Sequence, residues 1–197
     1  MELKKYFFAG MATLLISPSM ANAADGTITF NGMVTASACT AITGVSANGS
    51  APTKNAIVTL PNVTASTLNN GGIGTYTGQT AFNIQLTGCQ AIGTLNNVRT
   101  NFTTANTPAG DNYVMGNTAA GGSADVAVAI LTSAGTQIDL NGGTAVDPGA
   151  ALPLSSGTPG PIVMNYIAAY KPLTTSVTAG PVTGVADYVI SVSYTHL

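Results

Sequence analysis

Close to its N-terminus the chain reads TITFNGMV at residues 27–34. The even positions Ile28, Phe30, Gly32 and Val34 form an apolar row with one gap, whereas the odd positions are mostly polar. Because the side chains of a β-strand alternate between its two faces, this pattern predicts a strand that presents the four residues on one side. Period 2 alone leaves open whether the strand completes the sandwich of its own domain or lies outside it.

The residues ahead of this strand have the three parts of a secretory signal peptide. Lys4-Lys5 is followed by an apolar run from Tyr6 to Ile16, and Ala21-Asn22-Ala23 is a small-residue cleavage site. The alternative is a membrane anchor, but the run has 11 residues, whereas a helix needs about 20 to span a bilayer. We therefore expect residues 1–23 to be removed and the chain to be exported.

Charge and cysteine content narrow the class of protein. Without residues 1–23 the chain has three basic side chains against six aspartates and no glutamate. A chain without a basic patch cannot neutralise phosphates, so nucleic acid is not expected as a partner. Cys39 and Cys89 are the only cysteines. An even pair in an exported chain predicts a disulfide, with two free buried thiols as the alternative.

The spacing of turn residues in the exported part is typical of an all-β protein. No helix of more than two turns is predicted, and turn residues recur about every 8 to 15 positions, which is typical of a sandwich or barrel. We expect loops at residues 44–54 and 149–161 and a turn within residues 64–76. The expected strands of the body cover residues 34–40, 57–60, 80–89, 98–104, 125–132, 138–140, 162–170 and 180–190.

Residues suited to catalysis are scarce. The single histidine is His196, and the aspartates lie mostly beside Gly, Asn or Pro, where aspartate favours turns. A hydrolase needs a positioned base or a pair of carboxylates. Gly71-Gly72-Ile73-Gly74 lacks the Lys-Ser/Thr and the helix of a phosphate-binding loop, and no set of metal ligands is complete. We therefore expect no enzyme activity, no metal and no cofactor.

Several of these features together resemble the type 1-like fimbrial pilins of the chaperone–usher family of Gram-negative bacteria. The resemblance covers essentially the whole exported chain, and its motifs follow the family's order and spacing. They are the signal peptide, FNG at residues 30–32, Cys39, FNIQLTGC at 82–89, VAVAIL at 126–131 and the ending from Gly180 to Ile190.

The resemblance implies an immunoglobulin-like sandwich that lacks its last strand, formed here by residues 36–192. It also implies that residues 24–35 are an N-terminal extension that completes the sandwich of a neighbouring subunit. The donor side chains would be Ile28, Phe30, Gly32 and Val34, with Gly32 at a position that excludes bulk. The acceptor strand, which would also bind the chaperone, carries Gly180, Val182, Gly184, Ala186, Tyr188 and Ile190.

The partners implied by the resemblance are other copies of the chain and other fimbrial subunits, a periplasmic chaperone and an outer-membrane usher. The expected function is that of a shaft subunit of an adhesive surface fimbria, which polymerises by donor-strand exchange after export through the periplasm. The alternative is a minor or tip subunit that binds a host glycan or surface. Residues 193–197 depart from the family ending and are expected to be an atypical tail, with a sequence artefact as one explanation.

Overall fold

The computed structural model describes residues 38–193. The chain divides into two units, Met1–Thr35 and Ala36–Leu197, and all described residues belong to the second. The predicted signal peptide and the predicted donor residues Ile28, Phe30, Gly32 and Val34 lie outside the described residues, as do residues 194–197.

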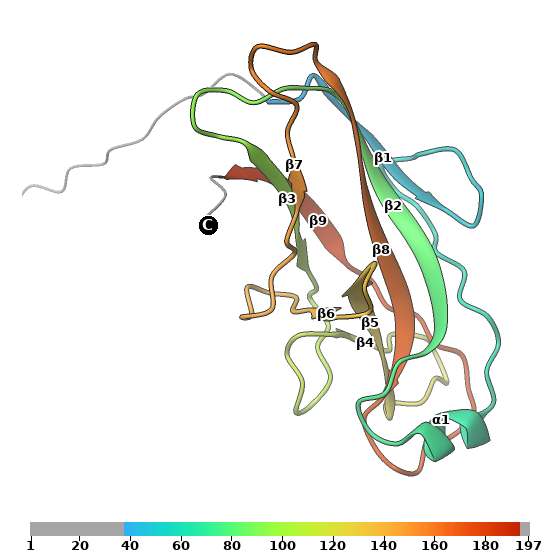
Figure 1. The fold of residues 1–197 in the computed structure, drawn as a ribbon. Coiled ribbons are helices and arrows are strands. Elements are labelled where there is room, and N and C mark those ends of the chain that lie inside the picture. Colours follow the sequence, from blue (N-terminus) through green and yellow to red (C-terminus); the bar gives the residue numbers. More distant parts are fainter. Residues whose placement is uncertain (1–37, 194–197) are drawn as a thin grey trace, which may run out of the picture. The chain divides into compact units, whose positions relative to one another are not determined.

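Two antiparallel sheets make up the described unit (Figure 1). The larger sheet contains, in spatial order, β1 (Ala41–Ala47), β2 (Thr77–Cys89), β8 (Gly160–Pro172), β5 (Val126–Thr132) and β4 (Met115–Gly116), and β6 (Gln137–Ile138) pairs with β5. The smaller sheet contains β7 (Ala150–Ala151), β3 (Asn97–Thr103) and β9 (Asp187–Ser193). The prediction of an all-β protein is thus confirmed.

The core lies between the sheets and follows from the alternation along β2 and β8. Ile84 and Leu86 of β2 are fully buried, and their register partners on β8 are Met164 and Ile162. Phe82 contacts Tyr166 in the same ladder with tilted rings 5.5 Å apart, and Phe102 of the smaller sheet meets both rings edge-on at centroid distances of 6.5 and 5.2 Å. Each fully buried large apolar side chain contributes roughly 1.5–3 kcal/mol to folding.

A buried polar cluster joins the same two sheets. The Asp147 carboxylate accepts hydrogen bonds from the Tyr166 hydroxyl at 2.6 Å and from the Thr100 amide at 2.8 Å. Tyr166 also hydrogen-bonds the Thr100 hydroxyl at 2.9 Å. Burial, and then the bond to Asp147, raise the pKa of Tyr166 far above its ordinary value. The phenol therefore stays protonated and keeps the carboxylate satisfied.

The structure corrects the predicted boundaries at the N-terminal side of the body. Among the described residues the first strand is Ala41–Ala47, so it begins after residues 38–40 of the predicted strand at 34–40 and extends into the predicted loop at 44–54, while residues 34–37 lie outside the described residues. Gly44 makes this possible. Its φ of 123° forms an irregularity in the pairing with β2, and the backbone of Thr53 lies where a Cβ would be.

The segment from 64 to 76 also differs from the prediction of a simple turn. Residues Ala65–Gly71 form a two-turn helix, α1, whose Thr64 side chain caps the amide of Thr67 at 3.1 Å. Only Leu68 of this helix is buried, so its sequence has no apolar periodicity to reveal it. Within residues 38–193, no helix combines the length and apolarity needed to cross a membrane.

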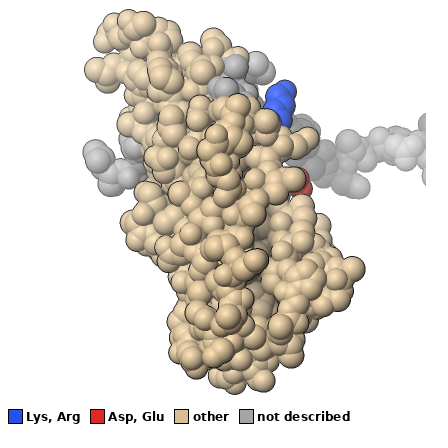
Figure 2. Space-filling view, turned by 90° about the vertical axis from the view of Figure 1, so that its right-hand side faces the viewer, with Lys and Arg blue, Asp and Glu red and all other residues tan. Residues whose placement is uncertain are grey.

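Charge is sparse on the surface of the described unit. The face in Figure 2 is almost wholly uncharged. Among the described residues, Asp147 is buried and Lys171 is paired with Asp111 at 2.8 Å. Long-range electrostatic attraction can therefore contribute little to any association of this unit, which leaves apolar contacts and hydrogen bonds.

Candidate functional site

The outer edge of β9 is open in the described structure. β9 pairs only with β3, in a register that sets Val189 opposite Asn101. The even residues of β3 bond elsewhere, because the Thr100 amide donates to Asp147 and the Phe102 carbonyl accepts from Asn141. In an antiparallel ladder, the hydrogen bonds between β3 and β9 must therefore be made by the odd-numbered residues of both strands. The amides and carbonyls of Tyr188, Ile190 and Val192 consequently point to the unpaired edge.

The alternation in the direction of the backbone groups continues N-terminal to β9, although the chain there does not pair with a strand. The Thr183 amide donates to the Asn117 side chain, and the Thr183 carbonyl accepts from the Thr118 amide, both at 2.9 Å. The carbonyl of Val185 accepts from the Thr104 hydroxyl at 2.8 Å. The odd residues are again satisfied on the inner side, which leaves the even ones on the open side. We call residues 180–193 the C-terminal edge.

The predicted strand at 180–190 thus has the expected alternation of side chains, but only its last residues pair with another strand. Strand pairing begins only at Asp187, because the preceding residues are held by the Asn117 and Thr104 side chains and by one backbone bond from the Thr118 amide rather than by a continuous ladder. The even residues of the C-terminal edge are half-buried from Val182 onward and the odd ones up to Val189 are exposed. Gly180 is exposed and lies against the backbone of Gly121.

Gly184 lies close against the larger sheet. A Cβ at this position would lie 3.0 Å from the Cβ atoms of both Met115 and Val128. The even face of the C-terminal edge therefore rests directly on β4 and β5. A side chain at residue 184 would push the edge away from the core.

A second open edge lies at residues 56–60, which we call the N-terminal edge. The sequence predicts a strand at 57–60, but the structure has no ladder there. The segment alternates nevertheless, because Ala56, Val58 and Leu60 are half-buried and Ile57 is 87% exposed. Among the described residues, its only backbone hydrogen bonds join Thr59 to the Asn48 side chain. A strand without a partner is what a missing neighbour would leave.

The two edges belong to one site. Apolar residues from both pack against the same core cluster; they are Ala56, Val58, Leu60, Val182, Ala186, Tyr188, Ile190 and Val192. At one end the Tyr188 hydroxyl donates to the Lys54 carbonyl at 3.4 Å. At the other end Val63 and Val182 pack against a shared cluster around Leu68. The edges therefore run antiparallel, and a strand between them would be parallel to one and antiparallel to the other.

The sequence predicted acceptor residues on only one of the two edges. It placed the acceptor residues on the C-terminal edge, and the structure brings Val182, Gly184, Ala186, Tyr188 and Ile190 together there on one half-buried face. It did not assign a role to the N-terminal edge. The signal that could have done so is the alternation of Ala56, Val58 and Leu60 before Pro61.

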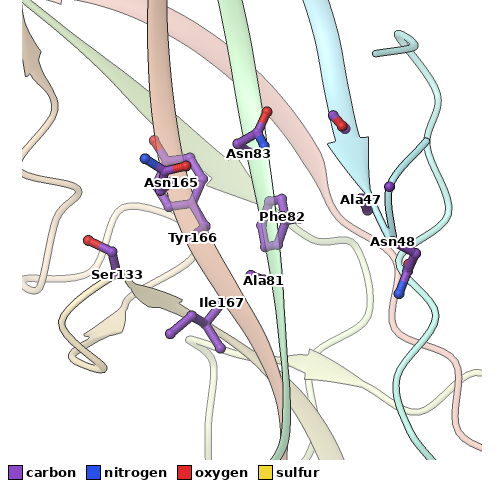
Figure 3. Close-up of a pocket in the computed structure, with 11 residues that line it drawn as sticks. Ala47, Asn48, Ala81, Phe82, Asn83, Ser133, Asn165, Tyr166 and Ile167 are labelled. Atoms are coloured by element: carbon purple, nitrogen blue, oxygen red, sulfur yellow. The ribbon is translucent and has the colours of Figure 1, made fainter. Parts of the chain in front are cut away.

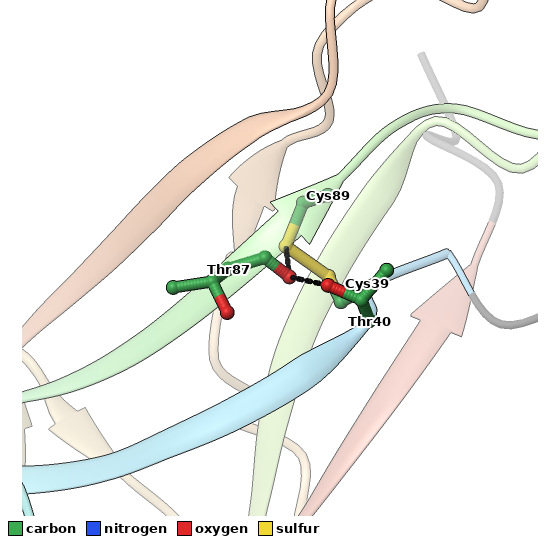
Figure 4. Close-up of a disulfide and its surroundings, with 4 residues drawn as sticks. All are labelled: Cys39, Thr40, Thr87 and Cys89. Carbon is green, nitrogen blue, oxygen red and sulfur yellow. Dashed lines mark hydrogen bonds between the residues drawn. A yellow bond between two sulfur atoms is a disulfide. The ribbon is translucent and has the colours of Figure 1, made fainter.

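The predicted disulfide is present and braces the start of β1. Cys39 is bonded to Cys89 at the end of β2 (Figure 4). Beside it the Thr87 carbonyl accepts from the amide of Thr40 at 3.0 Å and from its hydroxyl at 3.2 Å. The disulfide thus ties the residues just before β1 to the end of β2.

A shallow pocket of about 370 Å³ lies on the outer face of β1, β2 and β8 (Figure 3). Asn83 and Asn165, which are register partners, and Ser133 are among the polar residues that line it. The hydroxyl of Tyr166, which also lines the pocket, is bonded inward to Asp147. The lining can donate and accept hydrogen bonds but contains no base or carboxylate pair. Among residues 38–193, no cluster of three or more His, Cys, Asp or Glu could hold a metal.

Comparison with known proteins points in one direction. A family model described as fimbrial protein matches residues 28–193. The major fimbrial subunit SMF-1 of Stenotrophomonas maltophilia is 34% identical over 179 residues, which cover 90% of this chain and 98% of that protein. The F17 fimbrial protein of Escherichia coli is 32% identical over 186 residues, with coverages of 89% and 91%.

A solved structure of a chaperone–usher pilus shares the fold. It matches with a TM-score of 0.51 and 19% sequence identity, and the match covers 90% of this chain and all of that one. The curated relatives are fimbrial proteins by name.

Proposed function

The chain belongs to the fimbrial protein family, and from this premise we propose that it polymerises by donor-strand exchange. It is a structural subunit of a surface fimbria rather than an enzyme. In the proposed reaction, residues 27–34 of one copy insert between the N-terminal and C-terminal edges of the next. Ile28, Phe30, Gly32 and Val34 would then cover the half-buried residues of both edges.

One observation carries this proposal: among residues 38–193, two strand edges without a ladder partner flank one half-buried apolar surface. An inserted strand would satisfy the free backbone groups of Ala56, Val58 and Leu60 on one side and those of the even residues from Val182 to Val192 on the other. Each hydrogen bond would contribute about 1 kcal/mol net, and each buried Ile, Phe or Val roughly 1.5–3 kcal/mol. Summed over the strand, this is comparable to the stability of a whole domain.

Such a contact is heterologous, because a strand of one copy meets a different surface of the next. Contacts of this kind that do not close on themselves produce a filament. The relative from S. maltophilia is a major fimbrial subunit, and the match covers nearly all of it. This supports a place for the chain in the repeating shaft, not at the tip.

The same edges explain why we propose a chaperone, an usher and passage through the periplasm. An exposed pair of strand edges above an apolar surface invites aggregation. A periplasmic chaperone that lends its own strand would protect the site until the usher brings the next subunit. Strand addition to an exposed sheet edge is an established mode of recognition for pilins and their chaperones.

The experiment compares the full chain with a variant that lacks residues 24–34, each co-expressed with a chaperone of this family. Subunits are released and run on a denaturing gel without heating. We expect the full chain to form a ladder that collapses on boiling, and the deletion variant to form none while it still binds the chaperone. A full chain that stays monomeric and folds without a chaperone would contradict the proposal.

A further inference from the structure

Asn48 holds the N-terminal edge in a way that imitates a neighbouring strand. Its Oδ1 accepts from the Thr59 amide at 2.8 Å, and its Nδ2 donates to the Thr59 carbonyl at 3.1 Å. A paired residue of an antiparallel strand offers the same acceptor and donor to its partner. The carboxamide of Asn48 therefore occupies the place of a peptide group along an edge that lacks a strand.

The backbone around Asn48 fixes the position of this side chain. Asn48 has a φ of 51°, in the left-handed region that asparagine tolerates better than most residues. The turn that contains it is closed by the Ser50 amide on the Ala47 carbonyl at 2.9 Å and by the Ser46 hydroxyl on the Ser50 carbonyl at 2.6 Å. Behind it, Val45 and Thr53 form an isolated bridge. The carboxamide is thus anchored to the end of β1.

The bond to Thr59 determines which way the segment faces. In an extended chain the amide and carbonyl of one residue point to the same edge, and those of the next residue point to the other. Because Thr59 is bonded to Asn48, the amides of Val58 and Leu60 must point away from Asn48. The Lys54 carbonyl, just before this segment, is bonded to Tyr188, so the C-terminal edge lies beside the segment on the side that Asn48 does not occupy. Val58 and Leu60 therefore point toward that edge.

The C-terminal edge has an equivalent device. Asn117 accepts from the Thr183 amide with its Oδ1 and donates to the Pro181 carbonyl with its Nδ2, both at 2.9 Å. Each open edge is therefore held from behind by an asparagine side chain. On both edges, the backbone groups of the residues of opposite parity have no hydrogen-bond partner among residues 38–193.

We propose that Asn48 is a positioning residue that presents the N-terminal edge, already extended and in the correct parity, to an incoming donor strand. This inference rests on the proposed function. Without the carboxamide, the segment would be held only by its half-buried Ala56, Val58 and Leu60 side chains. The amides that a donor must meet would no longer have a fixed direction.

The test uses Asn48→Gly in the assembled full chain. Glycine accepts a positive φ and so keeps the turn, while the two hydrogen bonds to Thr59 are lost. Asn62→Ala is the matched control, because Asn62 lies exposed in the same extended part of the chain and its side chain has no hydrogen bond among the described residues. The readout is amide hydrogen exchange, residue by residue, in fibres of each variant.

We expect the amides of Val58 and Leu60 to be protected in wild-type fibres and to exchange about tenfold faster in Asn48→Gly. The amides of β2 and β8 should not change, and Asn62→Ala should match the wild type. Equal protection in wild type and Asn48→Gly would overturn the role of Asn48 alone, and so would a uniform loss across β2 and β8. Unprotected Val58 and Leu60 in wild-type fibres would overturn the proposed function itself, and this inference with it.

If Asn48→Gly does not form fibres, the same exchange is measured on its chaperone-bound subunit, where the chaperone strand takes the donor's place. Local acceleration at Val58 and Leu60 supports the proposal there as well. Protection equal to that of the wild-type complex overturns it.

Discussion

The closed ladder of β2 and β8 and the two open edges have the same sequence pattern but different depths of burial. In β2, Ile84 and Leu86 are fully buried and their neighbours are partly or fully exposed. In the C-terminal edge, Val182, Tyr188 and Ile190 alternate in the same way but are only half-buried. The difference is the number of neighbouring strands: β2 lies between β1 and β8, whereas β9 pairs, within residues 38–193, with β3 alone. The alternation of apolar and polar residues thus indicates a strand, and the depth at which its apolar side chains are buried indicates whether the strand has neighbours on both sides.

The largest effect of a substitution is expected in the donor strand that would insert between the N-terminal and C-terminal edges. Phe30→Asp would bring a carboxylate onto the half-buried surface between the edges, and an unpaired buried charge costs several kcal/mol. We expect no multimers on unheated denaturing gels and a normal yield of chaperone-bound subunit. Thr29→Asp, which changes the opposite face of the same predicted strand, should still assemble. Fibres from Phe30→Asp, or loss of its chaperone complex, would contradict this assignment.

The comparison can be sharpened by making the same truncation in each half. Ile84→Ala removes a fully buried side chain and should lower the free energy of unfolding by about 2–5 kcal/mol, whether or not a donor is bound. Ile190→Ala should cost about 1 kcal/mol in the chaperone-free chain and more when a synthetic peptide of residues 24–35 is bound. Urea unfolding with and without the peptide measures both. A cost at Ile190 that is independent of the peptide would mean that its surface is already complete.

Several parts of this comparison could be predicted from sequence. Strands with period 2 and clear punctuation, such as residues 80–89 and 162–170, were located within a few residues, and the Cys39–Cys89 disulfide was correct. The interactions that hold the edges could not be predicted. Asn48 meets Thr59 eleven residues away, and Asn117 meets Thr183 across 66 residues. Asparagine in a turn has the same local sequence whether its carboxamide faces water or a backbone.

The direction in which successive backbone amides point provides a more specific test of the N-terminal edge, with a smaller expected effect. Val58→Pro removes an amide that faces the open site, whereas Ile57→Pro removes one that faces away and has no hydrogen bond among the described residues. We expect Val58→Pro to weaken capture of the 24–35 peptide by about tenfold or more, corresponding to about 1–3 kcal/mol, and Ile57→Pro to leave it nearly unchanged.

Val58→Ala serves as the control for the Val58 side chain, because it keeps the amide. Binding of a labelled peptide, followed by fluorescence anisotropy, measures all three variants. Equal losses for the two prolines would show that direction along this edge does not matter.

The closed half can also be separated from the open edges by the pH dependence of its stability. Tyr166 is protonated in the fold, and its pKa is raised above the ordinary value of about 10 by burial and by its bond to Asp147. Stability from this group is therefore fully present below about pH 10 and is lost as pH rises further, by up to about 1.4 kcal/mol per pH unit. Tyr166→Phe should lower stability by about 1–3 kcal/mol at pH 7, since Asp147 loses a donor. It should also flatten the decline in stability above pH 10, where Tyr170, whose pKa is also raised by burial, maintains a residual slope.

Urea unfolding of peptide-bound chains between pH 7 and 12 measures this pH dependence. Parallel curves for wild type and Tyr166→Phe would show that the phenol does not couple the closed sheets to pH.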